Sequence, residues 1–91
     1  MSRMSGFNGS AVLDAGSIAD GNEQASTITV PGARLGDFVL VSCSLDLQDL
    51  DLGAAVTASN VVTYVLGNDT GGAIDLGSAT YRVKVIPFDV A

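Results

Sequence analysis

Residues 27–41 read TITVPGARLGDFVLV, and this stretch decides the fold class. Residues 27–30 alternate polar with apolar side chains, Pro31 and Gly32 punctuate the pattern, and a β-branched and aromatic run resumes at Phe38. The stretch therefore predicts a strand, a tight turn and a second strand. None of its side chains suggests catalysis.

Outward from this stretch, the sequence predicts short strands separated by turn signals at intervals of roughly ten residues. The expected strands are Ser10–Leu13, Gly16–Ala19, Gln24–Val30, Asp37–Ser44, Ala54–Ser59, Val61–Leu66 and Ala79–Ile86. The two strands on either side of Ser59-Asn60 should form a β-hairpin, and Pro87 should end the last strand. Helical periodicity is absent, so we expect an all-β fold: a small antiparallel β-sandwich or partly open barrel of about six to eight strands.

The predicted strand at residues 37–44 is unusual because both of its faces are fairly apolar. One face carries Val39, Val41 and Cys43, and the other carries Phe38, Leu40 and Ser42. Such a pattern is typical of a central strand of a sandwich, or of a strand whose second face is covered by a partner. The single cysteine is expected to be a small buried hydrophobe.

Composition predicts one domain with a thin core. The chain has 91 residues, of which 47% are hydrophobic but only 5% aromatic, and it lacks tryptophan. A domain of this size buries only about 60% of the surface that its unfolded chain exposes. The core should be built from Val, Leu, Ile and Ala, with oligomerisation or docking as the source of extra stability. Residues 1–9 are interpreted as an N-terminal arm, and residues 10–91 as a single β-sandwich domain.

Charge argues against several classes of partner. Ten acidic and four basic residues give a net charge of −6, and the basic residues are dispersed, so we expect no nucleic-acid binding. The N-terminus lacks the apolar region of a signal peptide, and no window reaches the length of a membrane span. We therefore expect a soluble protein made in the cytoplasm, with no membrane partner.

Two motifs suggest chemistry, and neither is well supported. Asp69-Thr70-Gly71 matches the aspartic-protease triplet, but it lies near the C-terminal end of the chain. The run that begins at Asp49 resembles the start of a calcium loop, but Asn60 occupies the twelfth position, where a glutamate is needed. Histidine, the usual general base, is absent. We expect no catalytic residue, no cofactor, no metal site and no enzymatic activity; a homodimeric aspartic protease acting through Asp69 is a minor alternative.

Three segments, taken together, resemble a known group of proteins. They are ITVPGARLGDFVLV (28–41), VVTYVLGNDTG (61–71) and ATYRVKV (79–85). This set is similar to small β-sandwich structural proteins of tailed bacteriophages, in which a strand pair with a Pro-Gly turn precedes a hairpin and a closing strand. Members of that group occur as capsid decoration (cement) proteins and as modules of tail or fibre proteins. The resemblance covers about residues 25–86.

The resemblance implies a role in the virion. Cement proteins commonly sit as trimers on the capsid and clamp adjacent subunits, so the expected partners are the major capsid protein and further copies of this chain, as a homotrimer. The expected location is the capsid surface, with assembly in the host cytoplasm. A chain of 91 residues that stands alone favours decoration over a fibre module. A tail, fibre or head-surface binding module is the alternative.

Apolar and acidic residues outside the predicted strands are the candidate partner contacts. They lie in the N-terminal arm and in an acidic, leucine-rich segment, residues 45–53, that is interpreted as a structured loop. The candidates are Met4, Phe7, Leu45, Asp46, Asp49 and Asp51. Against a basic patch on a partner, the acidic loop would improve steering and register more than raw affinity.

Overall fold

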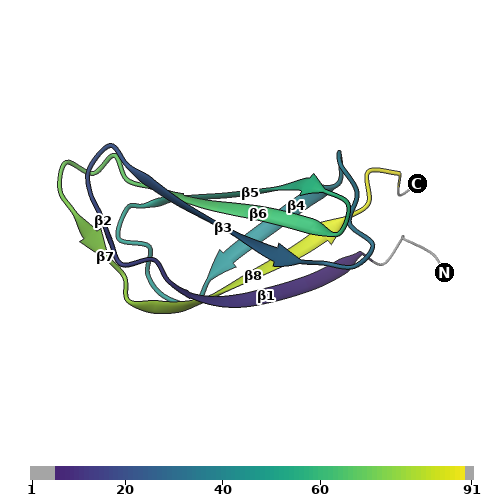
Figure 1. Ribbon diagram of the computed structural model, residues 1–91, viewed down its shortest axis with the longest axis horizontal. Coiled ribbons are helices and arrows are strands. Elements are labelled where there is room, and N and C mark those ends of the chain that lie inside the picture. Colours follow the sequence, from purple (N-terminus) through teal and green to yellow (C-terminus); the bar gives the residue numbers. More distant parts are fainter. Residues whose placement is uncertain (1–5, 90–91) are drawn as a thin grey trace.

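The computed structural model describes residues 6–89, an all-β protein that measures 46 × 20 × 18 Å (Figure 1). The strands are β1 (Phe7–Asp14), β2 (Ser17–Ile18), β3 (Glu23–Thr29), β4 (Phe38–Cys43), β5 (Asp51–Ala58), β6 (Val61–Gly67), β7 (Ile74–Asp75) and β8 (Ser78–Ile86). Two three-stranded antiparallel sheets have the orders β1-β8-β4 and β3-β6-β5, and β2 pairs with β7. The expected all-β class is confirmed.

The central strand of each sheet shows the alternation that the sequence predicts. In β8, Tyr81, Val83 and Val85 are buried while Arg82 and Lys84 are exposed, because successive side chains point to opposite faces. In β6, Val62, Tyr64 and Leu66 are buried and the residues that alternate with them are half-buried. The predicted β5–β6 hairpin is confirmed, and β8 ends immediately before Pro87, as expected.

The core lies between β6 and β8 and centres on two stacked tyrosines. The rings of Tyr64 and Tyr81 have centroids 4.9 Å apart and planes inclined by 26°, a stacked geometry that aromatic pairs favour. Aliphatic and small side chains surround them, and the buried set is Ile18, Ile28, Val30, Ala33, Leu50, Val56, Val62, Leu66, Ala79, Val83 and Val85. The expected aliphatic core is present, but the two tyrosines are its largest members.

Both tyrosine hydroxyls are buried without a hydrogen-bond partner among the residues that the structure describes. Burial raises the pKa of Tyr81 to about 12, and the side chain of Cys43, its cross-strand neighbour, adds to the shift. Cys43 itself is half-buried on the inner face of β4. An unpaired buried hydroxyl contributes packing but also a desolvation penalty.

Several boundaries differ from the prediction. β1 begins at Phe7, so residues 7–9 belong to the sandwich and not to an arm. β5 begins at Asp51, inside the segment that was expected to be a loop. The Gly-rich connection after β6 contains β7, which pairs with β2. β2 lies within the predicted strand Gly16–Ala19, whereas β7 was not predicted, because a two-residue strand carries too few side chains to show a period.

The position of β4 decides between the two interpretations of its apolar faces. It pairs with β8 on one side only, so it is an edge strand and not a central one. Val39, Val41 and Cys43 face the core and are half-buried, whereas Phe38 and Leu40 are exposed. The prediction of a central strand is therefore wrong, and a second face covered by a partner stays a prediction.

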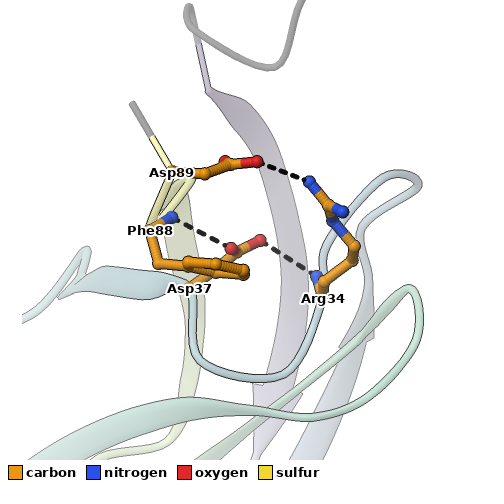
Figure 2. Close-up of polar contacts among 4 residues, drawn as sticks. All are labelled: Arg34, Asp37, Phe88 and Asp89. Atoms are coloured by element: carbon orange, nitrogen blue, oxygen red, sulfur yellow. Dashed lines mark hydrogen bonds and ion pairs between the residues drawn. The ribbon is translucent and has the colours of Figure 1, made fainter. Parts of the chain in front are cut away.

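Asp37 fixes the turn between β3 and β4 to the end of β8 (Figure 2). Its carboxylate accepts a hydrogen bond from the backbone N–H of Arg34, at 2.9 Å, and another from the backbone N–H of Phe88, at 3.1 Å. Arg34 in turn forms an ion pair with Asp89, and its guanidinium lies 5.7 Å from the centre of the Phe88 ring. Asp37 is 8% exposed, so solvent cannot replace these bonds.

Replacement of Asp37 by asparagine should destabilise the protein by about 2 kcal/mol, because an amide NH₂ would face a backbone N–H and one charge-assisted bond would be lost. Urea unfolding at neutral pH measures the change. Asp69→Asn is the matched control, since Asp69 is exposed and the substitution removes the same charge. Equal stability of the two variants would contradict the role assigned to Asp37.

Tyr81→Phe should leave the free energy of unfolding at pH 7 within about 1 kcal/mol of the wild type, because the lost hydroxyl has no hydrogen-bond partner within residues 6–89. Above pH 10 the two proteins should differ. The unfolded chain releases the tyrosine proton near pH 10 and the folded chain holds it to about pH 12, so wild-type stability should fall through this window by about 2–3 kcal/mol.

The loss of stability between pH 10 and pH 12 should be smaller in Tyr81→Phe than in the wild type. Urea unfolding at intervals from pH 7 to pH 12 measures it. A large loss of stability for the variant at pH 7 would show that the hydroxyl has a partner in solution.

Candidate partner-binding surface at the acidic end

The carboxylates of the chain gather at one end of the sandwich. We call this the acidic end: the end that carries β2, β7 and the connections at residues 19–22, 44–50 and 68–73 (Figure 1). The chain has ten acidic residues, and Asp37 and Asp89 lie at the opposite end, which leaves eight. These eight are Asp14, Asp20, Glu23, Asp46, Asp49, Asp51, Asp69 and Asp75.

The positively charged residues within residues 6–89 lie outside the acidic end. Arg82 and Lys84 are on the outer face of β8, and Arg34 is at the opposite end, paired with Asp89. Sheet register explains the acidic cluster: Asp14 is the last residue of β1, and Glu23 and Asp51 occupy matching positions at the start of β3 and β5. The acidic end therefore presents a strongly negative surface with no cation from residues 6–89 within it.

The connection between β4 and β5, residues 44–50, is held in a defined shape. Leu50 is buried and Leu47 half-buried, and the N–H of Leu50 donates to the carbonyl of Leu47 at 3.0 Å. The Asp46 carboxylate accepts from the N–H of Gln48 at 3.0 Å. Gln48 and Asp49 both have positive φ, a conformation that costs energy and persists only when its surroundings impose it.

Four of the predicted contact residues come together on this surface. Leu45 is 43% exposed, and Asp46, Asp49 and Asp51 are also exposed. Asp51 is the first residue of β5 and not a loop residue. The two leucines at positions 47 and 50 anchor the connection, so the carboxylates are presented without a large loss of order on binding.

Phe7 lies at the other end of the molecule from these four. It pairs with Val85, is half-buried, and packs so closely on Gly32 that a Cβ placed there would lie 2.8 Å from its ring. Phe7 thus has a packing role in the sandwich that the sequence did not reveal. Met4, the other predicted contact in the arm, lies outside the described residues.

Asn68 is the residue that organises the acidic end, and sequence analysis missed it. Its side-chain NH₂ donates to the carbonyls of Ile18, at 2.7 Å, and Gly72, at 2.8 Å. Its side-chain oxygen accepts from the N–H and the hydroxyl of Thr70, at 2.9 and 2.7 Å. Asn68 is 1% exposed, and its backbone also bonds to Gly21 and Asn22. One buried amide therefore joins two loops.

The aspartic-protease triplet is part of this arrangement. Asp69 and Thr70 follow the buried asparagine, and the N–H of Gly71 donates to Asp20 at 3.0 Å. Asp69 is exposed in a loop that Asn68 and Asp20 shape. The geometry gives the triplet a role in the turn.

A shallow polar groove of about 430 Å³ runs beside Asn68. Backbone and small polar groups line it, and Glu23 and Asp69 contribute carboxylates to its lining. Within residues 6–89, no three acidic or cysteine side chains converge as a metal ion would need, including those around Asp49. The arrangement can offer hydrogen bonds and negative charge to a basic or polar surface.

None of the elements in residues 6–89 is a helix of the length and hydropathy that a membrane crossing requires. A scan against protein-family models finds no family that matches the chain, and a search of curated proteins finds no matching relative. Sequence pattern and geometry therefore carry the functional assignment.

Asn68→Asp should destabilise the protein by about 2–3 kcal/mol at pH 7, because a carboxylate cannot donate to the carbonyls of Ile18 and Gly72. Lowering the pH towards 4 should narrow this gap, since protonation of the new side chain restores one donor. Urea unfolding across this pH range measures both effects.

Asn22→Asp is the control for this prediction, because it adds the same charge to an exposed position at the same end. If the two variants lose equal stability, charge repulsion at the acidic end, and not the buried hydrogen bonds of Asn68, is responsible.

Proposed function

We propose that this chain is a non-enzymatic structural protein of a tailed bacteriophage: a capsid decoration (cement) protein that binds the capsid surface and bridges neighbouring major capsid subunits. The observation that carries the proposal is the separation of charge, with eight carboxylates at one end of an elongated sandwich and the described cations outside that end. This surface suits a basic patch on a large assembly. The resemblance of residues 25–86 to phage structural proteins supports the same role.

The ordered loops of the acidic end support binding to a rigid partner surface. Leu47 and Leu50 anchor the β4–β5 connection, and Asn68 joins the loops beside it. Because these groups are ordered before binding, little conformational entropy is lost when they meet a partner. The carboxylates would steer the chain to a basic site and set its register, with ionic strength as a strong modulator.

The bridging mechanism needs a second contact besides the acidic end. Figure 1 shows that the two described chain ends lie together at the end opposite β2 and β7. That end carries exposed apolar side chains, among them Phe38 and Phe88. A rod with an acidic surface at one end and an apolar surface at the other can hold two neighbours, either two capsid subunits or a capsid subunit and another copy of this chain.

The proposal is tested by adding purified chain to expanded heads of the phage that encodes it, followed by cryo-electron microscopy. We expect saturable density on the outer surface of the shell, at positions shared between neighbouring capsid subunits. Heads with bound protein should also withstand heat or low ionic strength better than bare heads. Density on the tail alone would move the assignment to a tail module, and absence of binding would overturn the proposal.

A matched pair of variants tests the part played by the acidic loop. Asp46→Asn combined with Asp49→Asn should lower head affinity by about three- to tenfold at low salt. The control combines Asp69→Asn with Asp75→Asn, which removes the same charge at the same end. Asparagine keeps the acceptor oxygen at position 46 and tolerates positive φ at position 49, so the loop shape should persist. Equal losses would assign the effect to net charge alone.

A further inference from the structure

The outer face of β4 carries an exposed apolar patch. Phe38 is 63% exposed and Leu40 61%, although both belong to a regular strand. Ile86 is the cross-strand partner of Phe38, and Phe88, 52% exposed, follows it two residues later. We call these four residues the β4 patch. Two of the three phenylalanines of the chain thus face solvent while the core relies on tyrosine and aliphatic residues.

The edge strand that carries this patch lacks the residue types that usually protect a sheet edge against association. Among the other edge strands, β1 contains Gly9 and Asp14, β3 begins with Glu23, and β5 contains Asp51 and a register irregularity between Val56 and Ala58. β4, with the sequence FVLVSC, has no charge, proline, glycine or bulge. Charges, proline and bulges are the devices by which sheet edges avoid other chains.

Charge favours contact between copies at this patch. Two cations border the patch: Lys84, the partner of Leu40 on β8, and Arg34, which lies 5.7 Å from the centre of the Phe88 ring and is paired with Asp89. If β4 strands of two copies lay side by side, their Lys84 positions would be three strand spacings apart, about 14 Å, which exceeds the Debye length of about 8 Å in physiological salt. The eight carboxylates of the acidic end lie at the far end of the strands. In this edge-to-edge arrangement the Lys84 side chains of the two copies therefore repel each other little, and Arg34 is already paired with Asp89.

The available area also suits a second copy. The exposed parts of Phe38, Leu40 and Phe88 amount to on the order of 300 Å² for each copy, which is the size of the largest apolar patch on many monomers, a patch that is often functional. Two such patches with their polar rims approach the roughly 1,000 Å² that a specific interface needs. Burial of this area would also add to the small core that a chain of this length can form.

We propose that the β4 patch is the surface through which copies of this chain associate, with Phe38 and Leu40 at the centre of the contact. The inference deepens the proposed function, because it assigns one of the two contacts that bridging requires. Its test uses only the purified chain and no capsid.

Sedimentation velocity over a range of protein concentrations tests the inference. The wild type should associate, and Leu40→Glu should raise the dissociation constant at least about thirtyfold, as expected for a central interface residue. Phe38→Lys should have a similar effect. Val12→Glu is the matched control: Val12 is 69% exposed on the outer face of β1, in the same sheet, and lies outside the patch. Its dissociation constant should stay within about threefold of the wild type.

Circular dichroism and urea unfolding of each variant, measured at concentrations where the wild type is monomeric, verify that all have the same fold. A wild type that is monomeric at high concentration would overturn the inference and indicate that a different protein binds the patch. So would an assembly that Leu40→Glu and Phe38→Lys leave intact. A chain that associates through β4 but does not bind heads would contradict the proposed function and leave this inference standing.

Discussion

The stacked contact between Tyr64 and Tyr81 is the interaction on which the rest of the sandwich depends. These residues lie on β6 and β8, the central strands of the two sheets, and are the largest buried side chains in a core otherwise made of aliphatic and small residues. The stack fills the space between the sheets that small side chains alone would leave open. It also commits two hydroxyls to an apolar interior, a cost that the packing of both rings must offset.

Around this core, single polar side chains give the loops their shape. Asp37 ties the β3–β4 turn to the C-terminal segment, and Asn68 joins the loops of the acidic end. Asn60, in the turn between β5 and β6, holds the β3–β4 turn as well, since its side chain accepts from the N–H of Gly32 and its backbone bonds to Val30 and Ala33. Loop order in this small protein therefore comes from side chains that satisfy backbone groups, and the surfaces proposed for binding inherit that order.

Strand patterns predicted much of this fold, and what they missed has physical reasons. The β5–β6 hairpin and β8 were predictable because local alternation and turn residues specify them. Pairing of β1 with β8 joins the two ends of the chain and leaves no local signal. The edge position of β4 could not be predicted, because apolar residues on both faces are expected either for a central strand or for an edge strand covered by a partner. Leu45, Asp46, Asp49 and Asp51 could be proposed as contacts because they are apolar or acidic residues outside the strands predicted from sequence. Asn68 could not, because it resembles any polar residue of a glycine-rich loop.

The antiparallel register that places Phe7 opposite Val85 also brings the two described ends of the chain together. A short linker could therefore close the chain into a ring, and a new start could be cut into the connection between β4 and β5, where no strand would be interrupted. Such a circular permutant would keep both sheets but free the termini from the neighbourhood of Phe88. Tags or cargo joined to the new termini would then project from the acidic end.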